Sequence, residues 1–474
     1  MSGWRTVPLG ELLTESRIEA KASDPERRIT VKLNMKGVQR REPTAEKEGA
    51  TRYYVRKAGQ FIYGKQNLHK GAFGVVPKEL DGFQSSSDLP AFDVAPVIAP
   101  EWIHYWLVKG DTWRVFEKLA RGVGSRRTNV EDFLRFTISY PSEKAEQMRI
   151  IRWIQATEQQ HATLTTELAH QRALLKQLRQ AILDDAVLGV LDGAEAKDEQ
   201  AEVLVARIAE RKRILISKGL FPNKKRTERY RSTFGSELPK HWTTVELGDV
   251  TNIITSGSRG WAEFYSETGP KFIRAQNIRF GELLTTDLAC VTPPRKNDGQ
   301  RTLVERDDLF VVITGAGVST PARLNDDIGE AYVSQHVALI KPTMPETSEW
   351  LLLCLMAPMA CRDVLVSRAY GAGKPGLNLD NLRTLVLPFP PLEEQRRILA
   401  KVRARLGCLD GLESEVADSE LVSSTILQSV LSEVMGGPGV VRYAEAGGKL
   451  PLAAEPQVRL GRATKATSQA GEGQ

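Results

Sequence analysis

Long apolar runs are missing from this sequence of 474 residues. No stretch approaches the roughly 18 uncharged apolar residues that a membrane-spanning helix needs. The N-terminus, MSGWRTVPLGELLTESR, has no apolar core of the signal-peptide kind. These absences argue against a membrane protein and predict a cytoplasmic location, with no membrane among the partners.

Cysteine is scarce as well, because the sequence has only four: Cys290, Cys354, Cys361 and Cys408. They form no CxxC pair and have no histidine at metal-ligand spacing, so neither a zinc site nor a disulfide framework is indicated. We predict four buried thiols and no bound metal.

Motifs for catalysis are also lacking. GxxxxGK[ST] is absent, which excludes a P-loop ATPase, and VTPPRK and FPPLEE lack the Asn and the aromatic ring of amino-methyltransferase motifs. VVITGAGVST resembles the NAD-binding opening of sirtuin-type deacylases, but Thr320 stands at the third glycine position and Pro321 follows it. We predict a tight β-turn there, no cofactor and no catalytic residue.

The composition is that of an ordinary globular protein, with 41% hydrophobic and 26% charged residues. The chain is long enough for two or three independent cores. A net charge of +6 and a pI near 9.0 fit a polyanionic partner, but many proteins without nucleic-acid ligands are equally basic.

Four segments occur twice in the same order. GWRTVPLGEL matches KHWTTVELGDV, EWIHYWL matches EWLLLCL, RGVGSRRTNV matches YGAGKPGLNL, and AEQMRIIRWI matches EEQRRILAKV. The matches pair Trp4 with Trp242, Trp102 with Trp350 and Gln147 with Gln395. A repeat of this length indicates a duplicated domain with its connector.

Each copy begins with short β-like runs separated by Gly, Pro, Asn and Asp, and an apolar Trp-containing helix follows, predicted at Trp102–Leu119 and Trp350–Val366. The predicted fold class is therefore α/β (α+β), with two such domains in tandem and a pseudo-two-fold internal repeat.

Each copy ends in a long helical pattern without proline, whose apolar positions alternate in steps of three and four as in coiled coils. The first stripe is Ile150, Ile154, Thr157, His161, Leu164, Leu168, Gln171, Leu175, Leu178 and Ile182. The second is Leu399, Val402, Leu406, Leu409, Glu413, Val416, Glu420, Ser423, Leu427, Val430 and Val434. Between the copies, an amphipathic helix is predicted around Ala201–Lys218, before the basic run NKKRTERYR.

With these features the sequence resembles the specificity subunit of type I restriction-modification systems. The segments that carry the resemblance are FIYGKQNLHKGAFGVVPKELDGFQSSSDLPAFDV, HQRALLKQLRQAILDDAV, ELPKHWTTVELGDV and PFPPLEEQRRILAKV. It covers nearly the whole chain up to about Gly436. One departure is YPSEKAEQMRI in the first copy, where PPLxEQ-type sequence is usual.

The resemblance implies that each domain reads one half of a bipartite, asymmetric double-stranded DNA target. It also implies that the two helices pack antiparallel, fix the spacing and dock two methyltransferase subunits, and that restriction subunits join through the complex. S-adenosylmethionine, ATP and Mg are then expected on partner chains only. The predicted domains are target-recognition domain 1 (1–142), spacer helix 1 (143–191), a charged linker (192–237), target-recognition domain 2 (238–390), spacer helix 2 (391–435) and a flexible tail (436–474).

Base edges are read by Arg or Lys at guanine and by Asn or Gln at adenine, whereas phosphate contacts position the protein. Loop residues with such groups are the candidate DNA contacts. In the first copy they are Lys65, Gln66, Asn67, His69, Lys70, Ser85 to Ser87, Arg121, Ser125, Arg126 and Arg127. In the second they are Ser256, Ser258, Arg259, Arg274, Gln276, Asn277, Arg279, Thr314, Ser334, Gln335, His336, Arg368 and Lys374.

Asn129 and Asn378 each follow a GxG turn and precede an apolar run, which favours a turn or cap role over base contact.

The alternative function for the chain as a whole is a helical adaptor that pairs two binding domains without nucleic acid.

Overall fold

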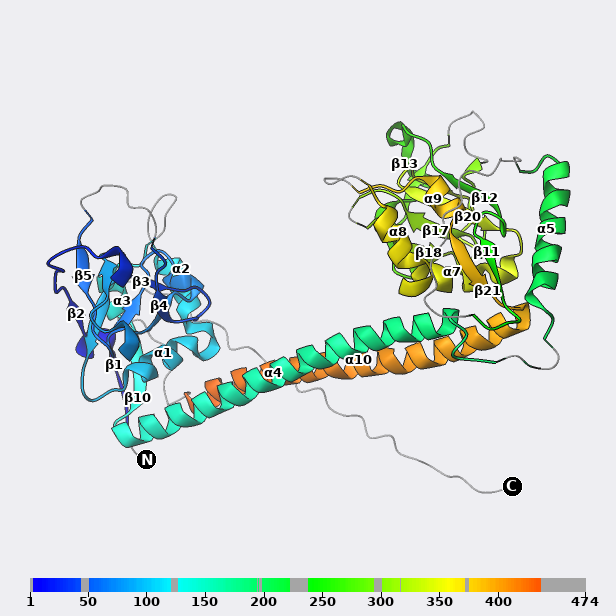
Figure 1. The fold of residues 1–474 in the computed structure, drawn as a ribbon. Coiled ribbons are helices and arrows are strands. Elements are labelled where there is room, and N and C mark those ends of the chain that lie inside the picture. Colours follow the sequence, from blue (N-terminus) through cyan, green and yellow to red (C-terminus); the bar gives the residue numbers. More distant parts are fainter. Residues whose placement is uncertain are drawn as a thin grey trace, which may run out of the picture. The chain divides into compact units, whose positions relative to one another are not determined.

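The computed structural model describes residues 3–43, 51–120, 127–193, 195, 198–221, 238–293, 301–315, 317–370 and 375–435. Backbone contacts divide the chain into two units. Unit 1 holds the described residues of Met1–Thr165 and Glu420–Gln474, and unit 2 holds those of Thr166–Ser419. Figure 1 shows a strand-rich domain in each unit.

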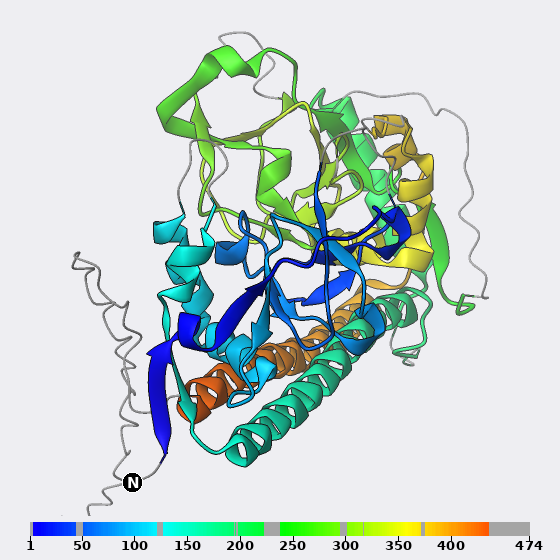
Figure 2. The same ribbon diagram turned by 90° about the vertical axis from the view of Figure 1, so that its left-hand side faces the viewer.

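Unit 1 is built on a four-stranded antiparallel sheet with the order β2-β9-β6-β7, and this domain faces the viewer in Figure 2. Further antiparallel pairs are β1-β10, β3-β4 and β5-β8. The strands are β1 (Trp4–Pro8), β2 (Leu13–Ser16), β3 (Ile29–Val31), β4 (Val38–Arg40), β5 (Tyr53–Val55), β6 (Phe61–Tyr63), β7 (Phe73–Val75), β8 (Gln84–Ser86), β9 (Ala91–Val94) and β10 (Thr137–Pro141). The helices are α1 (Pro100–Val108), α2 (Phe116–Leu119) and α3 (Val130–Leu134), with 3-10 turns η1 (Leu9–Glu11), η2 (Pro25–Arg27), η3 (Leu68–Lys70), η4 (Lys78–Leu80) and η5 (Lys109–Val115).

Unit 2 contains a four-stranded antiparallel sheet with the order β12-β20-β17-β18, and β11 pairs with β21. It adds the sheet β16-β13-β19, in which β13 and β19 are parallel, and the hairpin β14-β15. The strands are β11 (Thr243–Glu246), β12 (Thr251–Ser256), β13 (Tyr265–Ile273), β14 (Ile278–Arg279), β15 (Glu282–Leu283), β16 (Ala289–Val291), β17 (Leu309–Val312), β18 (Pro321–Arg323), β19 (Ala331–Val333), β20 (Val337–Pro342) and β21 (Val386–Phe389). The helices are α5 (Ala201–Ser217), α7 (Ser348–Met356), α8 (Asp363–Arg368) and α9 (Leu379–Arg383), with short turns η6 (Trp261–Phe264), η7 (Ala275–Asn277), η8 (Pro345–Thr347) and η9 (Pro358–Arg362).

The two main sheets share one strand order, which confirms the predicted tandem repeat. The matched tryptophans also have the same environment. The ring of Trp102 meets Trp4 edge-on at 5.7 Å between centroids, and Trp350 meets Trp242 at 5.6 Å. The indole N–H of Trp102 donates to the Ser139 carbonyl, as that of Trp350 donates to the Pro388 carbonyl.

The matched glutamines hold the start of each long helix. The side-chain amide of Gln147 donates to the Pro141 carbonyl at 2.8 Å, and that of Gln395 donates to the Pro390 carbonyl at 2.9 Å. The departure YPSEKAEQ in the first copy therefore leaves this junction in place.

Both Trp-containing helices are shorter than predicted. The first ends at Val108, because Gly110 and Asp111 adopt left-handed φ values of 53° and 57°. The second ends at Met356 two residues before Pro358, which has no N–H to donate to a preceding carbonyl. The helix after the first copy agrees better, since α5 spans Ala201–Ser217.

Asn378 is the N-cap of α9, and its side chain accepts from the N–H groups of Asp380 and Asn381, which confirms the predicted cap. VVITGAGVST lies in a β-hairpin, because β17 returns directly into β18 and Gly315 has a φ of 96°. A strand follows this turn, so it offers no helix N-terminus for a pyrophosphate.

The prediction of four buried thiols was wrong in part. Cys354 and Cys361 are buried, and burial raises the pKa of both thiols, but Cys290 is half-buried and Cys408 is exposed on a long helix. No single helix of the described chain has the length and apolar composition to cross a membrane, whereas one pair bent by 78°, Pro345–Met356 with Pro358–Arg368, passes that test when its two parts are joined.

The long helices are α4 (Lys144–Val187) and α10 (Leu392–Val434), and each begins in one unit and ends in the other. Within unit 2 they run antiparallel, since Leu175 lies beside Val416 and Arg179 pairs with Asp410. Figures 1 and 2 show the two helices side by side.

Only part of each predicted stripe is buried. Residues seven apart, Leu168, Leu175 and Ile182 on α4 and Val402, Leu409 and Val416 on α10, are at most 9% exposed, whereas Leu164 and Leu178 are 43% and 49% exposed. Two helices share a single contact seam. Of the two apolar positions in each heptad, one is therefore fully buried in the seam, and the second lies at the edge of the seam and stays partly exposed.

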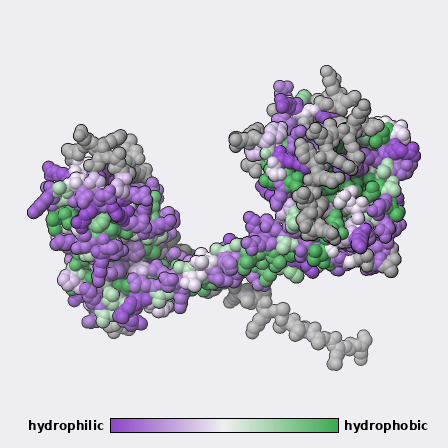
Figure 3. Space-filling view, viewed as in Figure 1, coloured by the Kyte–Doolittle hydropathy of each residue, from purple (hydrophilic) through white to green (hydrophobic). Residues whose placement is uncertain are grey.

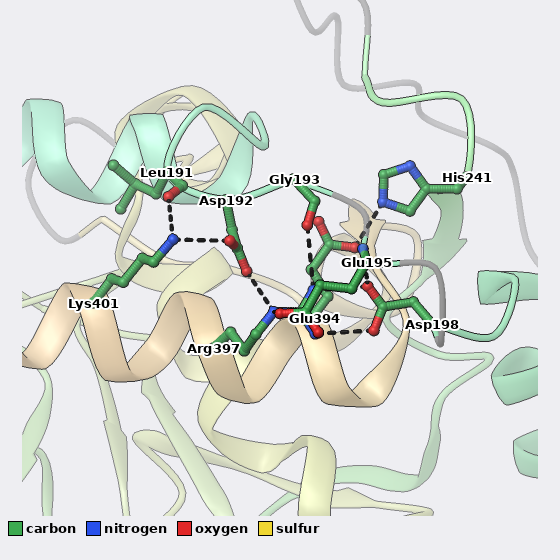
Figure 4. Close-up of polar contacts among 9 residues, drawn as sticks. All are labelled: Leu191, Asp192, Gly193, Glu195, Asp198, His241, Glu394, Arg397 and Lys401. Atoms are coloured by element: carbon green, nitrogen blue, oxygen red, sulfur yellow. Dashed lines mark hydrogen bonds and ion pairs between the residues drawn. The ribbon is translucent and has the colours of Figure 1, made fainter.

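A network of ion pairs fastens the start of α10 to the chain on either side of α5 (Figure 4). The Arg397 guanidinium donates to Asp198 at 2.7 Å and to Asp192 at 2.8 Å, and Lys401 donates to Asp192 at 2.8 Å. His241, just before β11, lies 2.7 Å from the buried carboxylate of Glu394. The hydrogen bond from Arg397 lowers the pKa of Asp198 to about 2.

Replacing Arg397 by Met should lower the unfolding free energy of unit 2 by about 3 kcal/mol at pH 7, because the largely buried Asp198 carboxylate loses its cation and Asp192 keeps only Lys401. The pKa of Asp198 is depressed in the folded state, so its contribution is present above the ordinary pKa and is lost as the pH falls through about 2. The difference between the two proteins should therefore shrink in acid. Denaturant unfolding at several pH values measures it.

Arg149→Met is the matched control, because Arg149 occupies the repeat position of Arg397 but forms its ion pair on the surface, with the partly exposed Glu146 of its own helix. Its effect on stability should be much smaller than that of Arg397→Met, because water screens an exposed ion pair. Equal losses from the two substitutions would contradict the anchoring role of Arg397.

Candidate nucleic-acid interface

Three segments of unit 1 meet at one end of the main sheet. We call them corner 1: residues 64–67 after β6, residues 86–88 before β9, and residues 127–128. The N–H of Lys65 donates to the Asp88 carbonyl at 2.9 Å, and the N–H of Thr128 donates to the Lys65 carbonyl at 2.8 Å. The Arg127 guanidinium lies 3.4 Å from the Asp88 carboxylate, and both side chains are half exposed.

A buried arginine, Arg56, forms hydrogen bonds to residues that flank corner 1. The side chain of Arg56 is 1% exposed and donates to the Ser85 hydroxyl and to the carbonyls of Ser16 and Leu89. Burial lowers its pKa to about 10, so it remains a cation at neutral pH. The bonds to Ser85 and Leu89 hold the residues on both sides of 86–88, and the bond to Ser16 ties them to β2.

Unit 2 contains an equivalent corner 2: residues 312–315 after β17, residues 334–336 before β20, and residues 375–377. The N–H of Ile313 donates to the His336 carbonyl at 2.9 Å, and the N–H of Leu377 donates to the Ile313 carbonyl at 2.8 Å. These are the same two backbone bonds as in corner 1. The duplicated fold thus presents two frames of one shape that carry different side chains.

The end of β12 joins corner 2 through a close approach of two backbones. Gly257 donates its N–H to the Ser334 carbonyl, and a Cβ at this glycine would lie 2.0 Å from the Val333 carbonyl oxygen. The guanidinium of Arg301 donates to the hydroxyls of Thr255 and Ser258 on the same segment. Only glycine leaves room for this packing.

Comparison with known proteins agrees with this architecture. Residues 239–404 match the family model for the type I restriction modification DNA specificity domain. Over these residues the chain is similar to the specificity subunits of type I restriction enzymes. It is 24% identical to the EcoAI specificity subunit of Escherichia coli over 53% of this chain and 42% of that protein, and 22% identical to the EcoBI subunit over 57% and 56%. The matched region thus spans about half the length of these relatives.

Solved structures share the fold of nearly the whole chain. An HsdS subunit from Thermoanaerobacter tengcongensis covers 92% of this chain and 97% of its own length at a TM-score of 0.53 and 19% identity. A chain from a structure described as showing complex assembly and conformational transition of the type I R-M system covers 92% and 98% at a TM-score of 0.62 and 18% identity.

Many of the predicted DNA contacts lie in the two corners or on segments that adjoin them. In unit 1, Lys65, Gln66, Asn67 and Arg127 are in corner 1, and His69 and Lys70 form the adjoining turn η3. In unit 2, Thr314, Ser334, Gln335 and His336 are in corner 2, with Ser256, Ser258, Arg259 and Arg274 on segments that adjoin it.

Other predicted contacts lie elsewhere or serve the fold. Asn277 is 4% exposed, and its amide bonds the backbone of Arg274 and Asp287. Arg368 donates to the Asn381 carbonyl and links α8 to α9, whereas Gln276 and Arg279 are exposed around the short strand β14. Arg121, Ser125, Arg126 and Lys374 lie outside the described residues.

Sequence reasoning missed Arg56, Asp88 and Arg301. Asp88 occupies the repeat position of His336, so aligning the two copies residue by residue would have found it. Arg56 and Arg301 act through partners distant in sequence, and no local motif marks them.

Proposed function

We propose that this specificity subunit reads a bipartite, asymmetric DNA target, one half with each sheet domain, and catalyses no reaction itself. The duplicated corner carries the proposal. One backbone frame with different polar side chains is what two readers of unlike half-targets require. Two different sequences need different donors and acceptors on frames of similar geometry.

The residues of each corner fit this task by their chemistry. Lys65 and Lys70 near corner 1, and Arg259 near corner 2, offer charges suited to phosphates, which position a protein on the duplex. Gln66, Asn67 and Gln335 offer paired donors and acceptors suited to base edges. The corners are short segments held at the ends of strands by backbone hydrogen bonds, which favours accurate placement of these groups.

The proposed partners are two methyltransferase subunits, with restriction subunits joining through the complex. Apolar side chains left exposed on α4 and α10 support such docking: Leu164, Leu174, Leu178, Leu412, Leu421, Val422 and Ile426. S-adenosylmethionine, ATP and Mg would then bind partner chains, and the complex would work in the cytoplasm. We further propose that α4 and α10 fix the gap between the half-targets.

Selection from a random duplex pool tests the proposal. The full chain, purified with co-expressed methyltransferase subunits, is mixed with the pool and excess competitor DNA, and the bound duplexes are sequenced. We expect two enriched base clusters separated by a constant gap. Recovery of unselected sequences would favour the adaptor alternative, and a single cluster would refute the two-reader arrangement.

A further inference from the structure

Gln335 stands on the turn between β19 and β20, next to His336 and across from Thr314. Its side-chain Nε2 lies 3.2 Å from His336 Nε2, and His336 Nδ1 lies 2.5 Å from the Thr314 hydroxyl. Gln335 is exposed, whereas His336 and Thr314 are half-buried. The three side chains form a short chain of hydrogen bonds that ends at an exposed amide.

A neutral imidazole has one donor and one acceptor nitrogen, so the direction of the bond at one nitrogen fixes that at the other. If the Gln335 amide donates to Nε2, then Nδ1 carries the proton and donates to the Thr314 hydroxyl. The amide of Gln335 then has one N–H and its carbonyl oxygen directed to other partners. Adenine presents an N6 donor and an N7 acceptor at its major-groove edge, which match these two groups.

The backbone below this amide is held from two sides. The N–H of Ser334 donates to the Ile273 carbonyl, and the Ser334 carbonyl accepts from Gly257. Since the turn and the imidazole are already ordered, little side-chain entropy remains to be lost on contact with a base. The equivalent turn of unit 1 carries Ser87 and Asp88 in place of Gln335 and His336, so this chain of bonds belongs to unit 2 alone.

We propose that Gln335 recognises an adenine in the half-target read by unit 2, and that His336 and Thr314 are positioning residues that hold its amide for that contact. The proposal rests on the DNA-reading function proposed above. It names the base and the residue.

Selection with the complex of full chain and methyltransferase subunits tests this inference. The wild-type complex should select an A·T pair at a defined position of the unit 2 half-target. Gln335→Ala should reduce discrimination at that position roughly 5- to 150-fold, the range expected for one bidentate contact. Gln335→Arg should move the preference there to G·C, and the unit 1 half-target should stay unchanged.

Variants of Thr314 distinguish a positioning role of the imidazole from a general effect on stability. Thr314→Val removes the acceptor for the imidazole and should weaken selection at the same base pair, whereas Thr314→Ser keeps the hydroxyl and should restore it. Ser87→Ala, at the repeat position of Gln335, should leave the unit 2 half-target unchanged.

Three results would overturn the inference: a unit 2 half-target without any selected A·T pair, an unchanged profile in Gln335→Ala, or a loss spread evenly over all its positions. A wild-type complex that selects no sequence would instead remove the proposed function itself. The two failures are therefore distinguishable.

Discussion

Placing glutamates at Leu174 and Leu412 should prevent assembly with the methyltransferase subunits while the chain keeps its fold. The two leucines are 48% and 46% exposed and line a groove of about 360 Å³ between α4 and α10 within unit 2. Leu175, Val416, Gln171, Glu415 and Ser419 complete its lining. Figure 3 shows apolar surface along this part of the helical pair.

The size of the effect follows from the area that a partner would cover. Burying one exposed leucine fully stabilises a contact by about 1.5–3 kcal/mol, and these two begin half-buried, so together about 1.5–3 kcal/mol is lost. That corresponds to a drop in affinity of roughly 10- to 150-fold before the cost of desolvating two carboxylates is added. Co-purification and titration with the methyltransferase subunits measure it.

Gln180→Glu with Ser414→Glu is the matched control, because both residues are exposed on the same helices but do not line the groove. This pair adds the same charge and should assemble normally. Normal assembly of the leucine double variant in its folded form would contradict docking at the groove.

The repeat and its helices were predictable because their signals are local. Trp4 and Trp242 mark the start of each copy, and the three-and-four stepping of leucines marks α4 and α10. The exposure of Leu164 and Leu178 was not predictable in this way, because a heptad pattern indicates which residues favour a seam but not how many helices share it. A helix that packs against one other helix buries only some of the apolar positions of its heptad pattern.

The candidate site was predictable as a set of residue types and not as a geometry. Loop glutamines, asparagines and arginines suggested base contacts, and many of them lie at the corners. Asn277 looked equally suitable in sequence, but it is buried and bonded to backbone within its own loop. Arg56 had no signal, since its three partners come from separate segments that only the folded sheet brings together.

Exchange of residues 247–385 for the equivalent segment of another specificity subunit should replace one half of the DNA target and leave the other half intact. The exchanged segment includes all of corner 2. It leaves β11 and β21 of the recipient paired, because the boundary falls where the N–H of Leu247 donates to the Leu385 carbonyl. The donor segment needs Trp at the position of Trp350, which packs against the retained Trp242.

The expected change is large, because each mismatched base pair costs about 1–3 kcal/mol and these costs add at separate positions. Two altered base pairs already lower affinity for the original target at least about 30-fold. Pool selection with the chimeric complex should show a new half-target, the old unit 1 half-target and, since α4 and α10 are untouched, the same gap.

The reciprocal exchange gives the control within the same molecule. Leu9 and Phe136 mark the equivalent boundary in unit 1, where the N–H of Leu9 donates to the Phe136 carbonyl at 2.7 Å. Exchange of residues 9–136 should change the other half-target and leave the unit 2 half-target as it was. If either chimera altered both half-targets, or if a folded chimera altered neither, the two domains would not read DNA independently, and the duplicated corners would need another explanation.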